Sequence, residues 1–431
     1  MRLLLKNARA YQSGVFRKSD VLIADGRIAA CAESLSCGGA RVLDCTDMFI
    51  FPGLADVHVH LREPGFSYKE TIETGTLAGA AGGFTALCAM PNLRPAPDSP
   101  AHLREELDLI RAGARIPVYP YACLTSGGTG RGELLDYAAL AADCVGFSDD
   151  GKGVQSGDLM RRVMLAVRET GRPIAAHCED ETLLRGGYIH DGDYARAHGH
   201  RGICPESEWG PIARDLELVR ETGCPYHVCH VSTKESAALL REARREGLPV
   251  SGETAPHYLL LCDADLQEDG RFKMNPPLRS AKDRQAILEA VVDGTLDILV
   301  TDHAPHSAEE KSRGLQGSAF GVVGLETALS ANWTALIEPG LIPPEKLAEL
   351  MSVNPRKRFS LPEAVIVEDA RADLCVFDPR GKHSVDASKF YSKGKSTPFD
   401  GMALCGRVKL TIFGNEVVFD AGDWNEENRG I

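Results

Sequence analysis

Short runs of apolar residues alternate with amphipathic segments through the middle of the chain, from about residue 51 to residue 359. The apolar runs are too uniform for half-exposed strands and are typical of strands buried on both faces. They lie at residues 116–123, 144–147, 173–176, 225–229, 249–252 and 296–300. The segments between them predict amphipathic helices at residues 157–170, 211–222, 234–246 and 281–293. Repeated strand–helix units of this kind predict an α/β fold with a parallel sheet.

Three of the predicted helices end with the same signals. Gly171, Gly223 and Gly247 each follow a helical segment, and a strand that begins with proline comes two residues later. Glycine adopts the left-handed conformation that closes a helix, and proline prevents the helix from continuing. The number of units, about eight, favours a closed (β/α)8 barrel over an open sheet.

Both ends of the chain have a β-type pattern instead. Residues 21–24 and 27–30 flank Asp25-Gly26, a dipeptide that favours a tight hairpin turn. Near the other end, residues 408–413 and 416–419 flank Gly414-Asn415 in the same way. We therefore predict a small β-sandwich domain built from both ends, residues 1–50 and 361–431, beside a barrel at residues 51–360.

Composition and charge narrow the range of functions. The 431 residues are 43% hydrophobic and 25% charged, which is ordinary for a globular protein and excludes a disordered chain. The net charge of −13 makes nucleic acid and anionic membranes poor candidates as partners. The longest uncharged stretch, residues 74–93, contains four glycines and Pro91, so we do not expect it to span a membrane.

The cysteines and the N-terminus favour the cytoplasm. The thirteen cysteines are scattered and include no Cys-x-x-Cys pair, which is typical of buried free thiols in a reducing compartment. Residues 1–12 lack the apolar core and cleavage site of a signal peptide. We therefore expect a cytoplasmic protein without a structural zinc knuckle.

Candidate metal ligands lie at the C-terminal ends of predicted strands, where barrel enzymes have their active sites. His58 and His60 are two residues apart on one strand, so both side chains face the same way and can bind one ion. Further candidates at strand ends are Asp150, His177, His230 and Asp302. A single histidine here is more often a hydrogen-bonded core residue, but the repetition at several strand ends predicts a metal site. Imidazole and carboxylate groups suit zinc.

Several motifs together resemble those of the dihydroorotases in the amidohydrolase superfamily. Residues 56–65, DVHVHLREPG, closely resemble the family signature DxHxHxR followed by Pro-Gly. Residues 90–92 (MPN), 275–279 (NPPLR) and 301–306 (TDHAPH) match further family motifs in the same order. The resemblance covers nearly the whole chain and is greatest to the class I bacterial type, the longer form with an extra β domain. It implies a zinc-dependent cyclic amide hydrolase that interconverts N-carbamoyl-L-aspartate and L-dihydroorotate in pyrimidine biosynthesis.

The resemblance also implies two zinc ions in each subunit. His58, His60 and Asp302 would hold the more buried ion, and His177 and His230 would hold the second. Zinc lowers the pKa of water from ~15.7 to near ~7, so a hydroxide shared by both ions would be the nucleophile at neutral pH. Asp302 would take the proton of the attacking water and deliver it to the ring nitrogen, which is otherwise a poor leaving group.

The group between the two ions differs from that of many relatives. Those relatives use a carboxylated lysine, whereas Asp150 stands at the matching strand end here, as in class I enzymes. Asp149 points the opposite way on a strand and is the weaker candidate, and Lys152 is expected at the surface. The missing lysine leaves open how fully the second metal site is occupied.

Substrate contacts follow from the resemblance in the same way. Arg62 lies two residues past His60, and a guanidinium there can bind a carboxylate with two hydrogen bonds. Each of these residues also has an interpretation without a substrate. Arg62 could form a surface ion pair. Asn92 and Asn275 could be turn residues beside a proline, and His306 could lie in an exposed loop. The full set of implied substrate contacts is His60, Arg62, Asn92, Asn275, His306, Phe320 and Gly321.

Two long insertions are expected to be lids over the active site, at residues 180–209 and 303–320. The first contains His190, His198 and His200, which we expect at the surface rather than as ligands.

Two alternatives compete with a dihydroorotase. A dihydropyrimidinase, hydantoinase or allantoinase would resemble the same barrel, but these enzymes normally carry the bridging lysine and need no arginine for a ring carboxylate. A non-catalytic structural partner of aspartate carbamoyltransferase is expected to have lost metal ligands, which are all present here. Association of an active enzyme with that partner, or with copies of itself, stays open.

Overall fold

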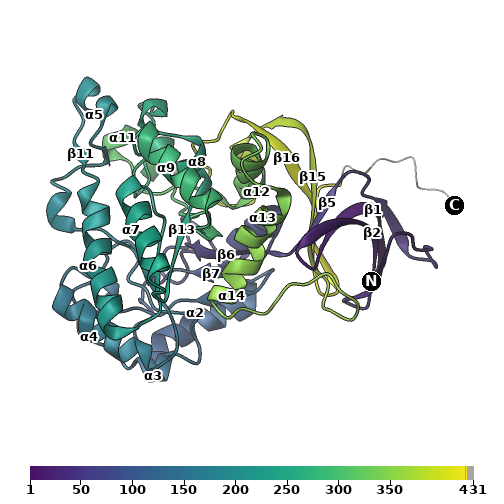
Figure 1. The fold of residues 1–431 in the computed structure, drawn as a ribbon, viewed down its shortest axis with the longest axis horizontal. Coiled ribbons are helices and arrows are strands. Elements are labelled where there is room, and N and C mark those ends of the chain that lie inside the picture. Colours follow the sequence, from purple (N-terminus) through teal and green to yellow (C-terminus); the bar gives the residue numbers. More distant parts are fainter. Residues whose placement is uncertain (423, 425–431) are drawn as a thin grey trace.

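The computed structural model (Figure 1) describes residues 1–422 and residue 424. This part of the chain has an α/β fold. Helices and short parallel strands occupy the larger part of the molecule, and a mixed sheet forms the other end. In Figure 1 the N-terminal strands, in purple, lie beside the C-terminal strands, in yellow. No helix of the described part is long and apolar enough to cross a membrane.

Seven parallel strands form two sheets in the larger part. Their sequence order matches the predicted strand–helix alternation, which confirms the α/β class. The three-stranded sheet contains β6 (Leu54–Val59), β7 (Phe84–Ala89) and β8 (Val118–Pro120). The four-stranded sheet has the order β14 (Ile298–Leu299), β13 (Val250–Thr254), β12 (Tyr226–Val228) and β9 (Ile174–Ala176).

Isolated parallel bridges connect these two sheets at both edges. Phe147 bridges Ala122, next to β8, and also Ile174 of β9. At the other edge, Val59 of β6 bridges His303, just after β14. Residues 144–147 were predicted as a strand, but the segment is not a regular one, because only Phe147 forms β-bridges. Backbone hydrogen bonds of Val145, Gly146 and Phe147 nevertheless connect it to the segments on both sides, so it joins the two sheets in place of a strand.

The predicted helices are present, with small shifts at their ends. They are α4 (Gly157–Arg168), α6 (Glu206–Thr222), α7 (Lys234–Arg245) and α9 (Ala281–Val292). Ser156, Thr233 and Ser280 cap α4, α7 and α9 by accepting a hydrogen bond from a backbone N–H in the first turn. Gly223 closes α6 in the left-handed conformation, with φ of 68°, as its position predicted.

The remaining helices and small strands complete the larger part. The longer ones are α1 (Ile72–Ala81) and α2 (Pro100–Gly113). The short helices are α3 (Tyr137–Leu140), α5 (Asp193–His198), α8 (Pro256–Leu260), α10 (Ala308–Lys311), α11 (Gly314–Gly317), α12 (Ala328–Asn332), α13 (Pro344–Ala348) and α14 (Asn354–Arg358). The small strands β10 (Ile189–His190) and β11 (Gly202–Ile203) pair with each other.

The strands of the two chain ends belong to one mixed sheet. Its order is β17-β16-β15-β5-β1-β2-β3, and β4 pairs with β1 beside this path. The bounds are β1 (Arg2–Gln12), β2 (Val15–Ala24), β3 (Arg27–Ala32), β4 (Arg41–Asp44), β5 (Phe49–Pro52), β15 (Asp373–Ser384), β16 (Ala403–Phe413) and β17 (Glu416–Asp420). Both predicted hairpins, β2–β3 and β16–β17, are confirmed. Antiparallel pairing of β5 with β15 joins the two chain ends.

This sheet curls around a core of its own. Gly26, beside β3, lies against Asn415 of the β16–β17 turn, so the two ends of the strand order come together. Leu3, Ile23 and Ile412 belong to one cluster of buried side chains inside the curl. The described strands therefore form one continuous curled sheet rather than two separate facing sheets.

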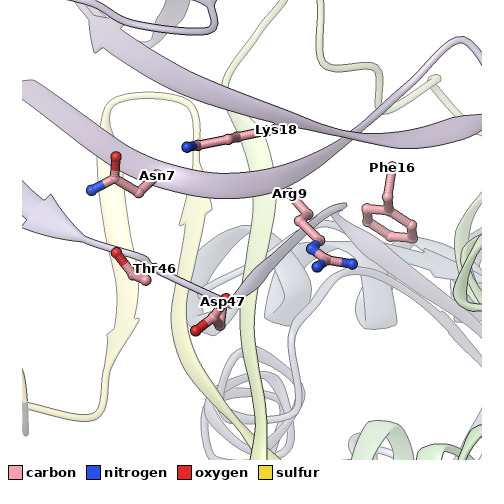
Figure 2. A pocket seen from close by; sticks show the side chains of 6 residues that line it. All are labelled: Asn7, Arg9, Phe16, Lys18, Thr46 and Asp47. Carbon is pink, nitrogen blue, oxygen red and sulfur yellow. The ribbon is translucent and has the colours of Figure 1, made fainter.

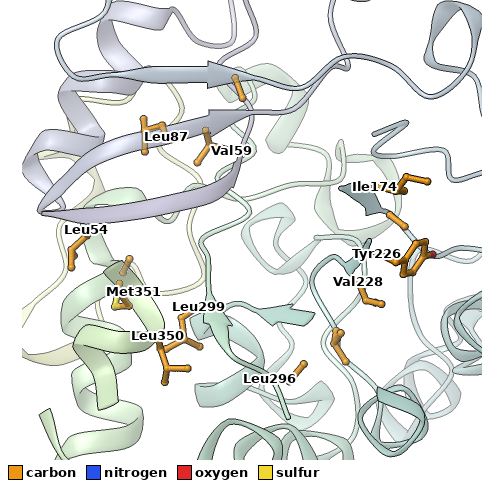
Figure 3. Packing of buried hydrophobic residues seen from close by; sticks show 14 of the residues in the cluster. Leu54, Val59, Leu87, Ile174, Tyr226, Val228, Leu296, Leu299, Leu350 and Met351 are labelled. Atoms are coloured by element: carbon orange, nitrogen blue, oxygen red, sulfur yellow. The ribbon is translucent and has the colours of Figure 1, made fainter. Parts of the chain in front are cut away.

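A second apolar core lies under the parallel sheets. Figure 3 shows Leu54 of β6, Leu299 of β14 and Met351 among its members. Met351 lies in the π-helical segment Glu349–Val353, which contacts both β6 and β14. Phe51 and Phe377, from β5 and β15, belong to the same cluster, with ring centroids 6.3 Å apart. The mixed sheet therefore shares a core with the parallel strands.

Candidate active site

A cavity of about 320 Å³ opens at the C-terminal ends of the parallel strands. Eleven of the residues predicted for the site line it, and His58 lies buried next to them. The predicted residues on its wall are His60, Arg62, Asn92, Asp150, His177, His230, Asn275, Asp302, His306, Phe320 and Gly321. The structure thus brings the whole predicted set together.

His58 is fully buried and lies between three carboxylates. Its Nε2 is 3.4 Å from Oδ1 of Asp150 and 3.5 Å from Oδ1 of Asp302. Its Nδ1 is 2.6 Å from Oε1 of Glu253 on β13. An ionised Glu253 can only accept, so Nδ1 donates to it, and Nε2, which points toward the two aspartates, is the nitrogen that could bind a metal ion.

His60 faces the same two aspartates from the cavity wall. Its Nε2 is 3.2 Å from Oδ1 of Asp302 and 3.5 Å from Oδ2 of Asp150. Its Nδ1 lies 2.8 Å from Oδ1 of Asn92, which accepts the ring N–H. Asn92 thus orients a candidate ligand, and its amide nitrogen is left available for the cavity.

Asp150 lies between the pair His58 and His60 and the pair His177 and His230. Its Oδ1 is 3.6 Å from Nδ1 of His177 and also 3.6 Å from Nε2 of His230. Asp149 points away, and its carboxylate accepts hydrogen bonds from Thr125 and from backbone N–H groups of that loop. This placement agrees with the choice of Asp150 over Asp149 as the bridging candidate.

The chemistry of this cluster fits divalent metal ions. His58, His60 and Asp302 offer ligand atoms within 4.8 Å of one another, and so do His58, Asp150 and His230. Nε2 of His58 and Oδ1 of Asp150 are buried with no hydrogen-bond partner in the described part of the chain. Leaving such atoms unpaired is costly, and a bound cation would satisfy them.

The pKa values of His58 and Asp150 also indicate a site that can bind a cation. Burial opposes the charged form of His58, but Glu253 and Asp150 outweigh it and raise its pKa well above the usual range. Burial likewise opposes ionisation of Asp150, yet His58, His177 and His230 hold its pKa well below the usual range. The site therefore favours positive charge among these side chains, and a metal ion can supply it in place of protons.

Arg62 is a buried cation on the wall of the same cavity. It is 8% exposed, so the alternative of a surface ion pair is wrong. Its Nε donates to the backbone oxygen of Pro305 at 3.1 Å, and its Nη2 is 3.4 Å from Nε2 of His306. Burial lowers the pKa of Arg62 to about 10, so it stays protonated at neutral pH and can bind an anion.

Asn275, Phe320 and Gly321 complete the wall. Nδ2 of Asn275 donates to Oε1 of Glu179 at 2.9 Å. The backbone oxygen of Phe320 is 2.7 Å from Nε2 of His306. Gly321 has φ of 130°, and a Cβ there would lie 2.7 Å from the Cβ of Ala304, so only glycine fits.

Three residues that contact the site were not predicted from the sequence. Glu253 orients His58, Glu179 holds Asn275, and Lys311 donates to the backbone oxygens of Lys273 and Gly321 at 3.0 and 2.6 Å. A carboxylate inside an apolar strand run was a usable signal for Glu253, because buried charges in strands usually have a partner. Lys311 gave no such signal, since it sits in a charged loop.

The two insertions are ordered around the cavity. The first forms β10, β11 and α5, and the second forms α10 and α11. His198 is exposed, and His200 contacts Tyr188 and Glu268, but His190 is 6% exposed, so its predicted surface position is wrong. It is buried because its strand, β10, packs into the apolar cluster around Tyr188 and Ile189.

A separate cavity of about 590 Å³ lies on the mixed sheet (Figure 2). Its lining contains one carboxylate and no histidine or cysteine. The residues around it are Asn7, Arg9, Phe16, Lys18, Thr46 and Asp47. Of these two cavities, only the one at the strand ends is lined by histidines.

Comparison with known proteins is consistent with this site. Residues 47–236 match the family model described as dihydro-orotase-like. The chain is 42% identical to a dihydroorotase of Bacillus cytotoxicus over 99% of both chains, and 44% identical to one of Geobacillus kaustophilus over 98% of this chain and 100% of the relative. Among solved structures, an L-hydantoinase (dihydropyrimidinase) from Arthrobacter aurescens has a TM-score of 0.86 at 27% identity, covering 98% of this chain and 97% of that one. A dihydropyrimidinase from Brevibacillus agri, at 20% identity, shares the fold with a TM-score of 0.84 over 98% and 96%.

Proposed function

Since this chain belongs to the dihydroorotase family, we infer that it is a cyclic amide hydrolase that interconverts N-carbamoyl-L-aspartate and L-dihydroorotate. The reaction opens or closes one ring amide and serves pyrimidine synthesis. One observation carries the assignment to this cavity: the buried guanidinium of Arg62 lines the same small space as the histidine–aspartate cluster. A substrate with a carboxylate beside a cyclic amide matches that pair of features.

We propose that the parallel segments form one (β/α)8 barrel. Two observations support this proposal: the bridges of Phe147 and His303 connect the two sheets at both edges, and the fold is similar to that of the L-hydantoinase. The proposed domain limits are residues 51–360 for the barrel and residues 1–50 with 361–431 for the β-sandwich domain. The curled mixed sheet would be that domain, folded around its own core as one continuous sheet instead of two separate ones.

The proposed cofactor is a pair of zinc ions. His58, His60 and Asp302 would hold one ion, His177 and His230 the other, and Asp150 would contact both. When bound, the metal lowers the pKa of water and polarises the amide carbonyl. Nitrogen and oxygen donors of this kind suit zinc, and the unpaired atoms of His58 and Asp150 support the assignment.

Asp302 is proposed to move the proton of the reaction. Burial raises the pKa of its carboxyl group, but hydrogen bonding to His60 and the charges of His58, His60 and His230 together outweigh burial, so the net pKa is lower than usual and the group is a carboxylate. A carboxylate facing the cavity accepts the proton of attacking water and then donates it to the departing ring nitrogen. In ring closure it takes the proton from the carbamoyl nitrogen instead.

The other wall is proposed to bind the carboxylate of the substrate. Arg62 supplies a charged donor, and the free amide nitrogen of Asn92 supplies a neutral one. His306 and the backbone at Phe320-Gly321 would contact the ring, and Asn275 faces the same space. This places the anion on one side of the substrate and the reacting amide on the side of the metal ligands.

Location and partners remain proposals. All thirteen cysteines are unpaired in the structure, which supports a reducing cytoplasm. Self-association and a complex with aspartate carbamoyltransferase stay predictions, which sedimentation of the protein alone and with that enzyme would test.

The test is a turnover assay on zinc-loaded protein with L-dihydroorotate, dihydrouracil, hydantoin and allantoin, with metal content measured on the same sample. We expect selective opening of dihydroorotate that a chelator abolishes. Preference for a neutral ring would favour a hydantoinase-type activity, for which the 27% identical structural relative is the supporting observation. Bound zinc without turnover of any ring would favour the structural-partner alternative.

A further inference from the structure

In the side-chain amide of Asn275, the nitrogen has a hydrogen-bond partner and the oxygen has none within the described part of the chain. Its Nδ2 donates to Oε1 of Glu179 at 2.9 Å. Its Oδ1 is buried and has no hydrogen-bond partner within the described part of the chain, and the residue lines the cavity. A buried acceptor without a donor is costly in free energy, so such an atom in a cavity wall points to a ligand that supplies the donor.

Glu179 decides which end of the amide is free. Its side chain is 11% exposed, and its Oε2 lies 3.6 Å from Nε2 of His177. The amide nitrogen of Asn275 donates to Oε1 of this glutamate, so the amide oxygen points away from Glu179 on the cavity wall.

The backbone around both residues is held in place. Gln155 donates from Nε2 to the backbone oxygen of Glu179 at 2.9 Å. On the other side, the hydroxyl of Tyr258 donates to the backbone oxygen of Pro276 at 2.6 Å, next to Asn275. The contact between Glu179 and Asn275 therefore joins two segments whose positions are fixed independently.

We propose that Glu179 is a positioning residue that fixes the amide of Asn275, so that its oxygen accepts an N–H of the substrate. This inference rests on the proposed function and adds a specificity element to it. The cavity then has a donor side, with Arg62, for the carboxylate, and an acceptor side, with Asn275, for a ring or carbamoyl N–H. A substrate alkylated on that nitrogen would lose the second contact.

A double-mutant cycle tests the proposal. Glu179→Ala leaves the amide free to turn, so we expect KM for dihydroorotate to rise about tenfold, with a smaller change in kcat and full zinc content. Asn275→Ala should raise KM to a similar extent. Because Glu179 acts through Asn275, the double variant should have the KM of Asn275→Ala alone.

Two results would overturn the proposal. One is an equal further rise in KM when Glu179→Ala is added to Asn275→Ala, which would show that the residues act independently. The other is a loss of zinc and of kcat at unchanged KM, which would mean that Glu179 serves only His177. Glu246→Gln is the matched control, because this exposed glutamate pairs with Arg220 far from the cavity, and no change is expected.

A second measurement does not depend on activity. Protein labelled with ¹⁵N at asparagine gives one side-chain amide signal that Asn275→Ala removes, and that signal should shift strongly in Glu179→Ala. An unchanged signal would refute the positioning role. If the parent enzyme opened another ring but not dihydroorotate, the proposed function would fail, whereas the cycle on that ring and the amide signal would still decide the role of Glu179.

Discussion

His306 is an imidazole surrounded by positive charge. Its Nδ1 is 3.2 Å from Nζ of Lys69 and 3.5 Å from Oε2 of Glu310, and Arg62 and Lys311 also face it. Burial, followed by these three cations, lowers its pKa to about 3. The ring is therefore neutral at physiological pH. Its Nε2–H can then donate to the backbone oxygen of Phe320 while Nδ1 accepts from Lys69.

Replacing Lys69 by methionine should raise the pKa of His306 from about 3 toward its ordinary value of about 6.5. Removing a neighbouring positive charge favours the imidazolium ion, and Glu310 remains to stabilise it. An NMR titration of the histidine ring signals would measure this shift. Lys69→Arg keeps the charge and is the control. The same low pKa in both variants would contradict the assignment.

Asp302→Asn should lower turnover by roughly 10²–10⁴-fold, the usual contribution of a general acid–base group. The amide has the shape of the carboxylate but cannot accept and return a proton. Kinetics on protein whose circular dichroism spectrum matches the parent would show this. Ordinary turnover in that variant would exclude the proton-transfer role.

Arg62→Met should raise KM for dihydroorotate by about 30-fold or more, since losing one partner of a buried charge pair costs roughly 2–5 kcal/mol. Neutral rings should bind as before. Comparing KM for dihydroorotate and dihydrouracil in both proteins measures the effect. An equal change for both rings would show that Arg62 does not select the carboxylate.

At the scale of single elements, the loop after β14 depends on one lysine. Lys311 is 6% exposed, and its Nζ donates to the backbone oxygens of Lys273, Ala319 and Gly321 at 3.0, 2.8 and 2.6 Å. These bonds connect α10 to the cavity wall. The loop is thus fixed from inside, without an ordered strand or long helix.

Lys311→Met should loosen this loop, because the backbone oxygens of Ala319 and Gly321 lose their donor, at a cost of about 1–3 kcal/mol for each left buried, while that of Lys273 keeps the N–H of Gly321. We expect faster hydrogen exchange at residues 312–321 and a higher KM. Lys389→Met, at an exposed position, is the control. Unchanged exchange in the Lys311 variant would show that other contacts hold the loop.

Residues at strand ends could be predicted from the sequence more accurately than contacts between loops. His58, His60 and Asp302 could be placed together because strands have a fixed period and parallel strands end at one face. Residues 144–147 have the same apolar pattern as true strands, but pairing depends on neighbours far away in the sequence. The contact between Asn275 and Glu179 likewise joins segments whose spacing no local pattern encodes.

At the scale of the whole molecule, the parallel strands and the mixed sheet share one buried apolar cluster. Phe51, Cys375, Phe377 and Cys405 share a core with the parallel strands. Buried Arg356 donates to the backbone oxygen of Gly53 and to Thr85, beside Asp373 of β15. The predicted domain limits therefore cut through a shared core, which hydrophobic patterns alone did not reveal.

A fragment of residues 51–360 should consequently fail to fold stably. It would expose the apolar faces that β15 and β16 cover, and Arg356 would lose Asp373. Thermal unfolding followed by circular dichroism, with the intact chain as reference, would show no cooperative transition in the fragment. A cooperative transition together with zinc binding would demonstrate an autonomous barrel.

The antiparallel pairing of β5 with β15 also affects how the chain is made. β5 ends at Pro52, and its partner begins at Asp373, so during synthesis one edge of β5 has no neighbour while more than three hundred further residues emerge. At about 5–20 residues per second, this interval lasts roughly 15–60 s. The nascent chain thus leaves the ribosome with an open apolar strand edge, and we expect this edge to bind chaperones and to start aggregation where they are missing.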